Sequence, residues 1–202
     1  MLIAYREISL IDDSELKEAF FMMSDERKEK CLRYRFDDDK RRCIAADMLV
    51  RSFISEQTGI QAGEIRFSCR AGGKPFAENA DMFFSVSHSG NYVAAAFSET
   101  DEVGADVECI RPVPASVMRF FCSENDVSFI LGGKALEDCC GNSGNKLTDE
   151  KVLERFFRVW CFKEAYFKRT GEGIGRSSAL INYAGFTKKE IFLPDAVISA
   201  VE

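Results

Sequence analysis

A glutamate lies in the middle of the apolar face of a predicted helix, in the segment RVWCFKEAYFKRTGEG at residues 158–173. At about 100° per residue, one sector of this helix collects four apolar residues, Phe157, Trp160, Cys161 and Phe167. Glu164 lies near the centre of that sector, and Lys168 follows one turn later. Because an uncompensated buried carboxylate is expensive, we expect Glu164 to face a cation or another charged partner.

Two further carboxylates lie in the predicted strand VGADVECI at residues 103–110. Alternation places Asp106 and Glu108 on one face beside Gly104, which leaves room for a ligand. Taken alone, this pattern is more often a solvent-facing strand. If Glu164 converges with the pair, a hard divalent cation such as Mg²⁺ would compensate all the charges, with water and phosphate oxygens completing its shell. A buried Glu164–Lys168 ion pair without metal is the alternative.

The only histidine, His88, lies between two serines in the segment FSVSHSGNY at residues 84–92. Hydroxyl, imidazole and backbone N–H groups at the end of a strand suit a phosphate. A lone histidine is also often structural. A serine hydrolase is disfavoured, because the sequence has no G-x-S-x-G nucleophile elbow.

Basic residues form a cluster upstream, consisting of Arg27, Lys28, Lys30, Arg33, Arg35, Lys40, Arg41 and Arg42. Such stretches are usually solvated faces of helices, although in an acidic protein they also suit an anion site. Lys74, in the turn GGKP, is another candidate phosphate contact. Neither a P-loop nor a G-x-G-x-x-G fingerprint is present.

The composition is that of a compact globular protein. The 202 residues are 46% hydrophobic and carry a net charge of −6, which argues weakly against general binding to nucleic acid or membranes. The eight cysteines form no C-x-x-C pair, which favours reduced apolar cysteines over disulfides or zinc. No apolar run approaches the roughly 20 residues of a membrane span. The segment MLIAYREISL lacks the features of a signal peptide, so we expect a cytoplasmic protein.

The order of the predicted elements indicates the fold class. Helices are predicted at 12–23, 24–36, 37–59, 115–121, 123–131 and 148–170. Strands are predicted at 2–9, 64–69, 82–89, 92–99 and 102–110, the last two as a hairpin or meander, with more strands after 179. Residues 132–146 are the candidate mobile loop. Because helices and strands occur in blocks, the sequence predicts an α+β fold and not a doubly wound α/β fold.

Three motifs in this order resemble the Sfp-type 4′-phosphopantetheinyl transferases. They are GKPFAENADMFFSVSHSG at 73–90, VGADVE at 103–108 and FFRVWCFKEAYFKRTGEGI at 156–174. The last matches the family's W-x-x-K-E-(A/S)-x-x-K signature through Trp160, Lys163, Glu164, Ala165 and Lys168. The likeness covers most of the chain, from about residue 20 to about residue 175.

This resemblance implies a reaction in which the 4′-phosphopantetheine arm of coenzyme A moves to a serine of an apo acyl or peptidyl carrier protein, releasing adenosine 3′,5′-bisphosphate. It implies that Asp106, Glu108 and Glu164 hold Mg²⁺ and that Lys168 stabilises or protonates the leaving group. Glu164 is then either a metal ligand alone or also the acceptor of the serine proton, directly or through a metal-bound water. The implied coenzyme A contacts are Lys74, Pro75, Ser87, His88, Arg42, Arg27, Lys30 and Lys163.

The resemblance also implies the architecture: two similar α+β halves, residues 1–100 and 101–202, forming an intramolecular pseudo-dimer with the active site between them. A monomer without nucleic-acid or membrane partners is expected. Cys43 replaces a polar residue that is common in relatives, and Arg27 replaces a lysine. Two alternatives stay open, a Mg²⁺-dependent enzyme acting on another nucleotide diphosphate and a catalytically silent module that binds carrier proteins.

Overall fold

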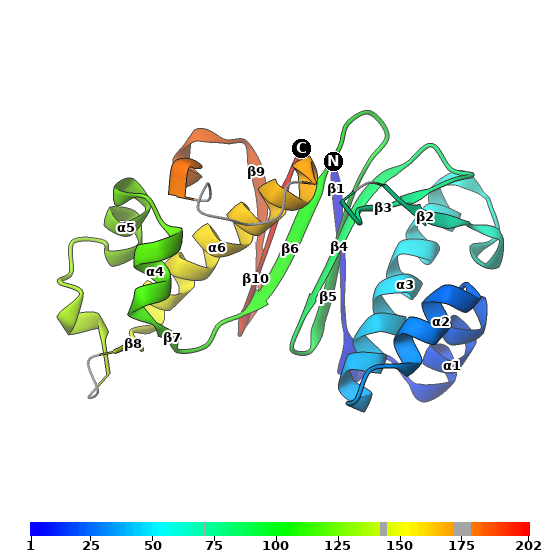
Figure 1. The fold of residues 1–202 in the computed structure, drawn as a ribbon, viewed down its shortest axis with the longest axis horizontal. Coiled ribbons are helices and arrows are strands. Elements are labelled where there is room, and N and C mark those ends of the chain that lie inside the picture. Colours follow the sequence, from blue (N-terminus) through cyan, green and yellow to red (C-terminus); the bar gives the residue numbers. More distant parts are fainter. Residues whose placement is uncertain (71, 142–144, 172–178) are drawn as a thin grey trace.

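The structure is a computed structural model that describes residues 1–70, 72–141, 145–171 and 179–202. It is an α+β protein in which strands run through the middle and helices flank them on both sides (Figure 1). Within the described residues, the main strands form two three-stranded antiparallel sheets with the orders β1-β5-β4 and β6-β10-β9. Their bounds are β1 (Leu2–Glu7), β4 (Phe83–Ser89), β5 (Tyr92–Ser98), β6 (Gly104–Cys109), β9 (Lys188–Phe192) and β10 (Ala196–Val201).

The N-terminal sheet packs against α3 (Asp37–Thr58), the long helix of this half. This helix begins with aspartates at the positive end of its dipole and ends at Gly59, whose φ of 76° is a conformation that glycine adopts freely. Phe53 of α3 stacks on Phe97 of β5, with ring centroids 3.8 Å apart. The other elements of this half are α1 (Asp13–Met22), α2 (Asp25–Leu32), β2 (Phe67–Cys69), β3 (Pro75–Ala77) and the 3-10 turns Ile8–Leu10 and Ala62–Glu64.

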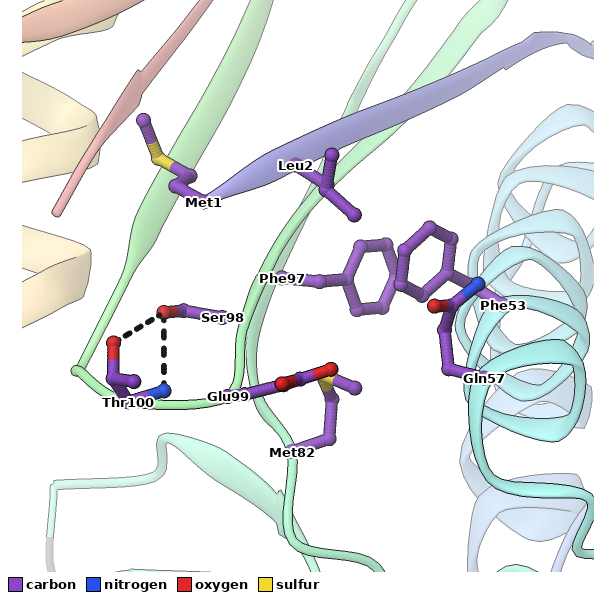
Figure 2. A pocket seen from close by; sticks show the side chains of 9 residues that line it. All are labelled: Met1, Leu2, Phe53, Gln57, Met82, Phe97, Ser98, Glu99 and Thr100. Carbon is purple, nitrogen blue, oxygen red and sulfur yellow. Dashed lines mark hydrogen bonds between the residues drawn. The ribbon is translucent and has the colours of Figure 1, made fainter.

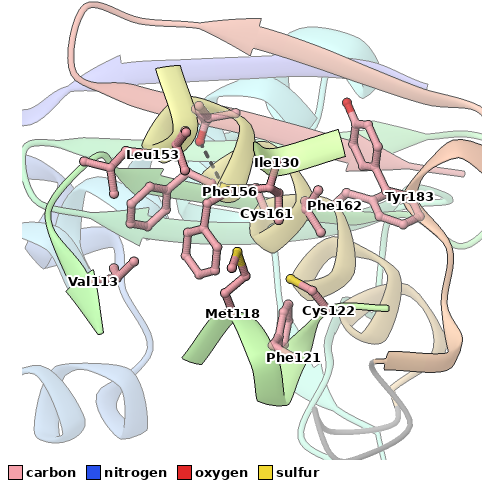
Figure 3. Close-up of a cluster of buried hydrophobic side chains, with 14 of the residues drawn as sticks. Val113, Met118, Phe121, Cys122, Ile130, Leu153, Phe156, Cys161, Phe162 and Tyr183 are labelled. Atoms are coloured by element: carbon pink, nitrogen blue, oxygen red, sulfur yellow. Dashed lines mark hydrogen bonds between the residues drawn. The ribbon is translucent and has the colours of Figure 1, made fainter. Parts of the chain in front are cut away.

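The C-terminal sheet packs against α6 (Glu150–Thr170), which contacts both β6 and β10. The helices α4 (Ala115–Phe121) and α5 (Glu124–Leu131) enclose a cluster of buried aromatic and aliphatic side chains with α6 (Figure 3). The close approach of α6 to β6 requires glycine at position 104, because a Cβ there would lie 1.7 Å from the carbonyl oxygen of Ala165. The remaining short elements are β7 (Val113–Pro114), β8 (Lys146–Leu147) and the 3-10 turns Glu137–Cys139 and Tyr183–Gly185.

Serine side chains join the neighbouring edges of the two sheets. We call Ser85, Ser87 and Ser89 of β4 the serine row, and each of them bonds to β6. Ser85 Oγ accepts a hydrogen bond from the Ala105 N–H (3.0 Å), and Ser87 Oγ donates one to the Asp106 carboxylate (2.7 Å). Ser89 Oγ accepts a hydrogen bond from the Cys109 N–H (3.2 Å) and donates one to the Glu108 carboxylate (2.8 Å). The two ends of the chain also meet here (Figure 1), where the Met1 ammonium lies 3.2 Å from the Glu202 carboxylate.

Most predicted elements are confirmed, although the helix predicted at 24–36 ends at Leu32. The predicted hairpin or meander of residues 92–110 is wrong, because β5 forms ladders with β1 and β4 whereas β6 pairs with β10. The candidate loop at 132–146 contains a 3-10 turn and β8, and its residues 142–144 lie outside the described residues. All eight cysteines are free thiols. Among the described helices, none is both long and apolar enough to cross a membrane.

Candidate active site

A cavity of about 620 Å³ lies between the two halves of the chain. Its walls come from α2, α3, the β2–β3 hairpin, β4 and the C-terminal part of α6. The predicted site residues on these walls are Arg27, Lys30, Lys74, Pro75, His88, Glu164 and Lys168. The structure therefore brings together residues that are as many as 141 positions apart in the sequence, Arg27 and Lys168 being the extremes.

Asp106 is the buried acidic centre beside this cavity. Its Oδ1 accepts hydrogen bonds from Ser87 Oγ (2.7 Å) and from Lys168 Nζ (2.6 Å), and its side chain is 4% exposed. Its Oδ2 is buried and has no hydrogen-bond partner in the described protein. Burial raises the pKa of Asp106, and Lys168 and Ser87 oppose that shift. Asp106 thus has one bonded oxygen and one buried oxygen without a partner among the described residues.

Glu164 is half-buried on the cavity wall, two residues past the fully buried Phe162. Burial raises its pKa from 4.5 to about 7, and the negative charges of Asp106 and Glu108 add to the rise while Lys168 opposes it. Among the described ion pairs, none joins Glu164 to Lys168, whose partner is Asp106. A carboxylate with a pKa near neutrality can accept a proton at physiological pH.

Glu108 completes the acidic face of β6, as the alternation of the strand predicts. It accepts hydrogen bonds from Ser89 Oγ (2.8 Å) and from Arg111 (2.8 Å). Within the described parts of the chain, no three His, Cys, Asp or Glu side chains are arranged to hold a metal ion. The predicted convergence of Asp106, Glu108 and Glu164 on Mg²⁺ therefore stays a prediction, which the free Oδ2 of Asp106 and the mutual repulsion acting on Glu164 favour.

The opposite wall of the cavity carries cations, although Glu26 and Asp47 also line it. Arg27 and Lys30 of α2 line it, and His88 at the end of β4 is exposed toward it. Desolvation lowers the pKa of His88, and the charges of Arg42, Lys168 and Arg27 lower it further. Desolvation and the neighbouring cations keep the imidazole of His88 neutral, and the same cations would attract a negatively charged ligand to this wall.

A second cavity, of about 230 Å³, lacks this chemistry (Figure 2). It lies among the start of β1, the end of α3 and the chain after β5, where Phe53 and Phe97 form part of its wall. As far as the structure describes its walls, they contain Glu99 but no lysine, arginine or histidine. A phosphate-bearing ligand therefore fits the larger cavity.

Comparison with known proteins identifies the family. Residues 12–101 match the family model for the N-terminal region of 4′-phosphopantetheinyl transferases, and residues 102–200 match that of the 4′-phosphopantetheinyl transferase superfamily. Over 165 residues, the chain is 32% identical to the 4′-phosphopantetheinyl transferase ffp of Bacillus subtilis and 31% identical to Sfp of Bacillus subtilis strain 168, covering 81% of this chain and 67% of each relative. It is 29% identical over 171 residues to the 4′-phosphopantetheinyl transferase HetI of Nostoc sp., covering 81% of this chain and 66% of that relative.

The chain belongs to the 4′-phosphopantetheinyl transferase superfamily. The family that the three sequence motifs indicated is thereby confirmed, and the protein is an enzyme that transfers a 4′-phosphopantetheinyl group.

Lys163, a predicted coenzyme A contact of the transferase, does not reach the cavity. Lys163 is 0% exposed, and its Nζ donates to Asp126 (2.6 Å) and to the Phe121 carbonyl (3.0 Å) inside the C-terminal half. Asp126 also accepts a hydrogen bond from the Tyr183 N–H (3.2 Å). The prediction for Lys163 is therefore corrected, because its ammonium joins α6 to α4, α5 and the segment before β9.

Three other predicted coenzyme A contacts of the transferase are engaged by protein groups. Arg42 is not on the cavity wall, and its guanidinium donates to Asp39 (2.7 Å) and to the Gly90 carbonyl (3.0 Å). Lys74 does line the cavity, but its ammonium donates to three acceptors of the C-terminal half, described below. Ser87 contacts Asp106 and Lys168 and lies behind the cavity wall.

The roles of some contributors to the transferase site were not recognised from the sequence. Ser85 and Ser89 hold β6 in place as members of the serine row. Their signal was present in SVSHS, where serines at alternate positions project toward one side of a strand. Tyr34 and Phe67 also line the cavity, and no local pattern distinguishes them from core aromatics.

Proposed function

We propose that this transferase moves the 4′-phosphopantetheine arm of coenzyme A to a serine hydroxyl of an apo acyl or peptidyl carrier protein, releasing adenosine 3′,5′-bisphosphate. One observation supports this most directly: a single cavity has Arg27 and Lys30 on its N-terminal wall and Glu164 and Lys168 on its C-terminal wall, with Asp106 bonded to Lys168. Arg27 and Lys30 suit the bisphosphate end of coenzyme A. Asp106 and Glu164 suit the end where the pyrophosphate is cleaved.

Asp106, Glu108 and Glu164 are the residues that would hold Mg²⁺ in this proposal. The unpartnered buried Oδ2 of Asp106 and the raised pKa of Glu164 fit a cation. A positive charge would give Oδ2 a partner and would stabilise the ionised form of Glu164. When bound, the cation would offset charge on the oxygens of the pyrophosphate.

The chain's own groups account for the proton and the leaving group. In the proposed step, the serine Oγ of the carrier forms a bond to the phosphorus of the phosphopantetheine arm, and the bond from that phosphorus to the oxygen of the departing bisphosphate breaks. The Glu164 carboxylate accepts the serine proton. Lys168, 34% exposed and 2.6 Å from Asp106, is placed to stabilise the new charge on the bisphosphate.

We further propose that residues 1–100 and 101–202 form the two halves of an intramolecular pseudo-dimer in a monomeric enzyme. The equivalent strand orders of the two sheets, β1-β5-β4 and β6-β10-β9, support this proposal. In each sheet the strand that comes last in the sequence lies in the centre and pairs with the first strand of that half and with the strand that directly precedes it. In each half the long helix, α3 or α6, packs on that sheet. The boundary between the two matched family regions, at residues 101 and 102, supports a division near Thr100.

The experiment that tests the function is intact-mass spectrometry of apo acyl and apo peptidyl carrier proteins incubated with this enzyme, coenzyme A and Mg²⁺. We expect a mass gain of one phosphopantetheine, abolished by chelation and by Asp106→Ala. Asp101→Ala is the matched control, because Asp101 is an exposed aspartate on the chain leading into β6. No gain on either carrier would favour another nucleotide diphosphate substrate or a silent carrier-binding module.

A further inference from the structure

Lys74 belongs to the N-terminal half, but its ammonium donates all of its hydrogen bonds to groups of the C-terminal half. Its Nζ donates to the carboxylate of Glu102 (2.5 Å), to the carbonyl of Val103 (2.9 Å) and to the carbonyl of Arg169 (3.0 Å). An ammonium has three N–H donors, so this geometry uses all of them. The side chain is only 12% exposed, which leaves it little contact with solvent.

Further bonds tie the same parts of the chain together. Arg70, at the start of the turn that contains Lys74, forms an ion pair with the second carboxylate oxygen of Glu102. Arg169 Nε donates to the Glu102 carbonyl (3.1 Å). Burial alone would raise the pKa of Glu102, but hydrogen bonds from Lys74 and Arg70 lower it overall. Glu102 is therefore a charged acceptor that holds the turn of one half and the last turn of α6 in the other.

This contact lies at one end of the coenzyme A cavity. Gly72, Gly73, Lys74 and Pro75 line the cavity from the turn, and Gly171 lines it from the end of α6. The two segments approach so closely that a Cβ on Gly72 would lie 3.2 Å from the Gly171 carbonyl oxygen. The position of the turn relative to α6 therefore sets the width of the cavity at this end.

We propose that Lys74 is a positioning residue, whose ammonium fastens the cavity-lining turn of the N-terminal half to Glu102 and to the C-terminal end of α6. Lys74 thereby fixes the wall on which coenzyme A binds relative to Glu164 and Lys168, which α6 presents from the other side. The phosphates of coenzyme A are bound by other cations. This role rests on the proposed function, since coenzyme A is the ligand used to measure it.

The decisive measurement compares Lys74→Met with Glu102→Gln by titration calorimetry with coenzyme A. If Lys74 acts through Glu102, both variants weaken coenzyme A binding, by roughly tenfold for a coupling between contacting residues, and the double variant is no weaker than Lys74→Met alone. If Lys74 instead binds a phosphate, Glu102→Gln frees its ammonium and leaves the affinity unchanged or improved. That second result would overturn the proposal.

A second ligand separates positioning from phosphate binding. A residue that binds the 3′-phosphate discriminates coenzyme A from 3′-dephospho-coenzyme A, and its loss removes that discrimination. We expect Lys74→Met to keep the ratio of the two dissociation constants of the wild type, and Lys30→Gln to reduce it. A reduced ratio in Lys74→Met would contradict the positioning role.

Hydrogen exchange provides a readout independent of coenzyme A. The turn is closed by the Gly73 N–H bonding to the Arg70 carbonyl and by the Arg70 N–H bonding to the Lys74 carbonyl, both at 2.9 Å. These amides should exchange faster in Glu102→Gln than in the wild type. The matched control is Glu78→Gln, because Glu78 bonds to Arg66 and Ser68 within the same hairpin. Equal exchange in Glu102→Gln and Glu78→Gln would refute the fastening, even if Lys74→Met failed to fold.

Coenzyme A binding by the wild type tests the proposed function, and coenzyme A binding by Glu102→Gln tests the role of Lys74. If the wild type does not bind coenzyme A, the proposed function fails, whereas the exchange experiment still tests the contact. If the wild type binds coenzyme A and Glu102→Gln binds equally well, the function stands and the role of Lys74 is wrong.

Discussion

The two halves of the chain share one structural feature, a buried basic residue on the long helix. Each long helix contains one buried basic residue that holds a connecting segment in place. In the N-terminal half, Arg51 pairs with Asp47 and donates to the carbonyls of Ala62 and Ile65. In the C-terminal half, Lys163 pairs with Asp126 and donates to the carbonyl of Phe121. These charges stabilise the connections and take no direct part in the cavity chemistry.

The halves differ in the charge that they present to the cavity between them. The N-terminal half presents Arg27, Lys30, Lys74 and His88 together with the carboxylates of Glu26 and Asp47, whereas the C-terminal half presents Glu164 and Lys168, with Asp106 behind them. The architecture is therefore shared, and the chemistry comes from a few side chains at the facing edges. A phosphate-rich substrate bound between the halves would be held from one side and cleaved from the other.

The largest effect should come from neutralising the acidic side. Glu164→Gln keeps the volume of the side chain but removes the proton acceptor, so we expect kcat to fall by roughly a thousandfold, within the range for a general base. Circular dichroism should show an unchanged fold. Glu154→Gln, on the exposed side of the same helix, is the control. If Glu164→Gln retained more than a tenth of the wild-type kcat, a role as the base would be untenable.

Removing the cation that contacts Asp106 should have the next largest effect. Lys168→Ala should lower kcat by roughly a hundredfold, with a much smaller change in coenzyme A affinity, if its charge acts mainly on the leaving group. Single-turnover kinetics and calorimetry measure the two quantities. Lys151→Ala, at an exposed position near the start of α6, should behave as the wild type. An unchanged kcat in Lys168→Ala would refute its role.

The two buried basic residues sharpen the comparison between the halves. Because each is paired in the interior, Arg51→Met and Lys163→Met should each lower the free energy of unfolding by about 3–5 kcal/mol, as measured by urea titration. Only Lys163→Met should also lower the kcat of the folded fraction, since Lys163 precedes Glu164 on α6. Equal losses of kcat in both variants would contradict this expectation, because they would show that packing around Arg51 affects Glu164 as strongly as packing around Lys163 does.

The smallest effect concerns the stability of the protein without divalent cations. The pKa of Glu164 is about 7 when folded and near 4.5 when exposed, so the folded state binds more protons between these values. The free energy of unfolding should therefore fall as the pH rises from about 4.5 to about 7. The change should be about 1 kcal/mol or less, because Glu164 is half-exposed. Glu164→Gln should make this slope less steep and Glu154→Gln should leave it unchanged, as urea titrations in chelator would measure.

Local signals in the sequence predicted the helices well. Asp12 and Glu15 form the capping box at the start of α1, and Gly59 and Gly171 end the two long helices in left-handed conformations. Alternation predicted correctly that Asp106 and Glu108 share a face of β6. These features depend on residues a few positions apart, which is why the sequence alone could specify them.

The remaining features depend on distant contacts. The pairing of β6 with β10 joins residues about ninety positions apart, and nothing in the segment 92–110 distinguishes it from a hairpin. The helix α6 is covered by a sheet on one side and by α4 and α5 on the other, so its buried surface is wider than one sector. For that reason the periodicity marked Glu164 as buried but missed Lys163, which is more deeply buried.

The serine row also affects how the protein avoids self-association. Strands β4 and β6 are the outer strands of their sheets, and a free edge readily recruits a strand from another molecule. Here the hydroxyls of Ser85 and Ser89 accept the N–H groups that β6 would otherwise offer to such a strand. The row therefore covers an aggregation-prone edge without closing the two sheets into one. Edge strands that flank an active site can in this way be blocked by side chains and still leave a cavity for the substrate.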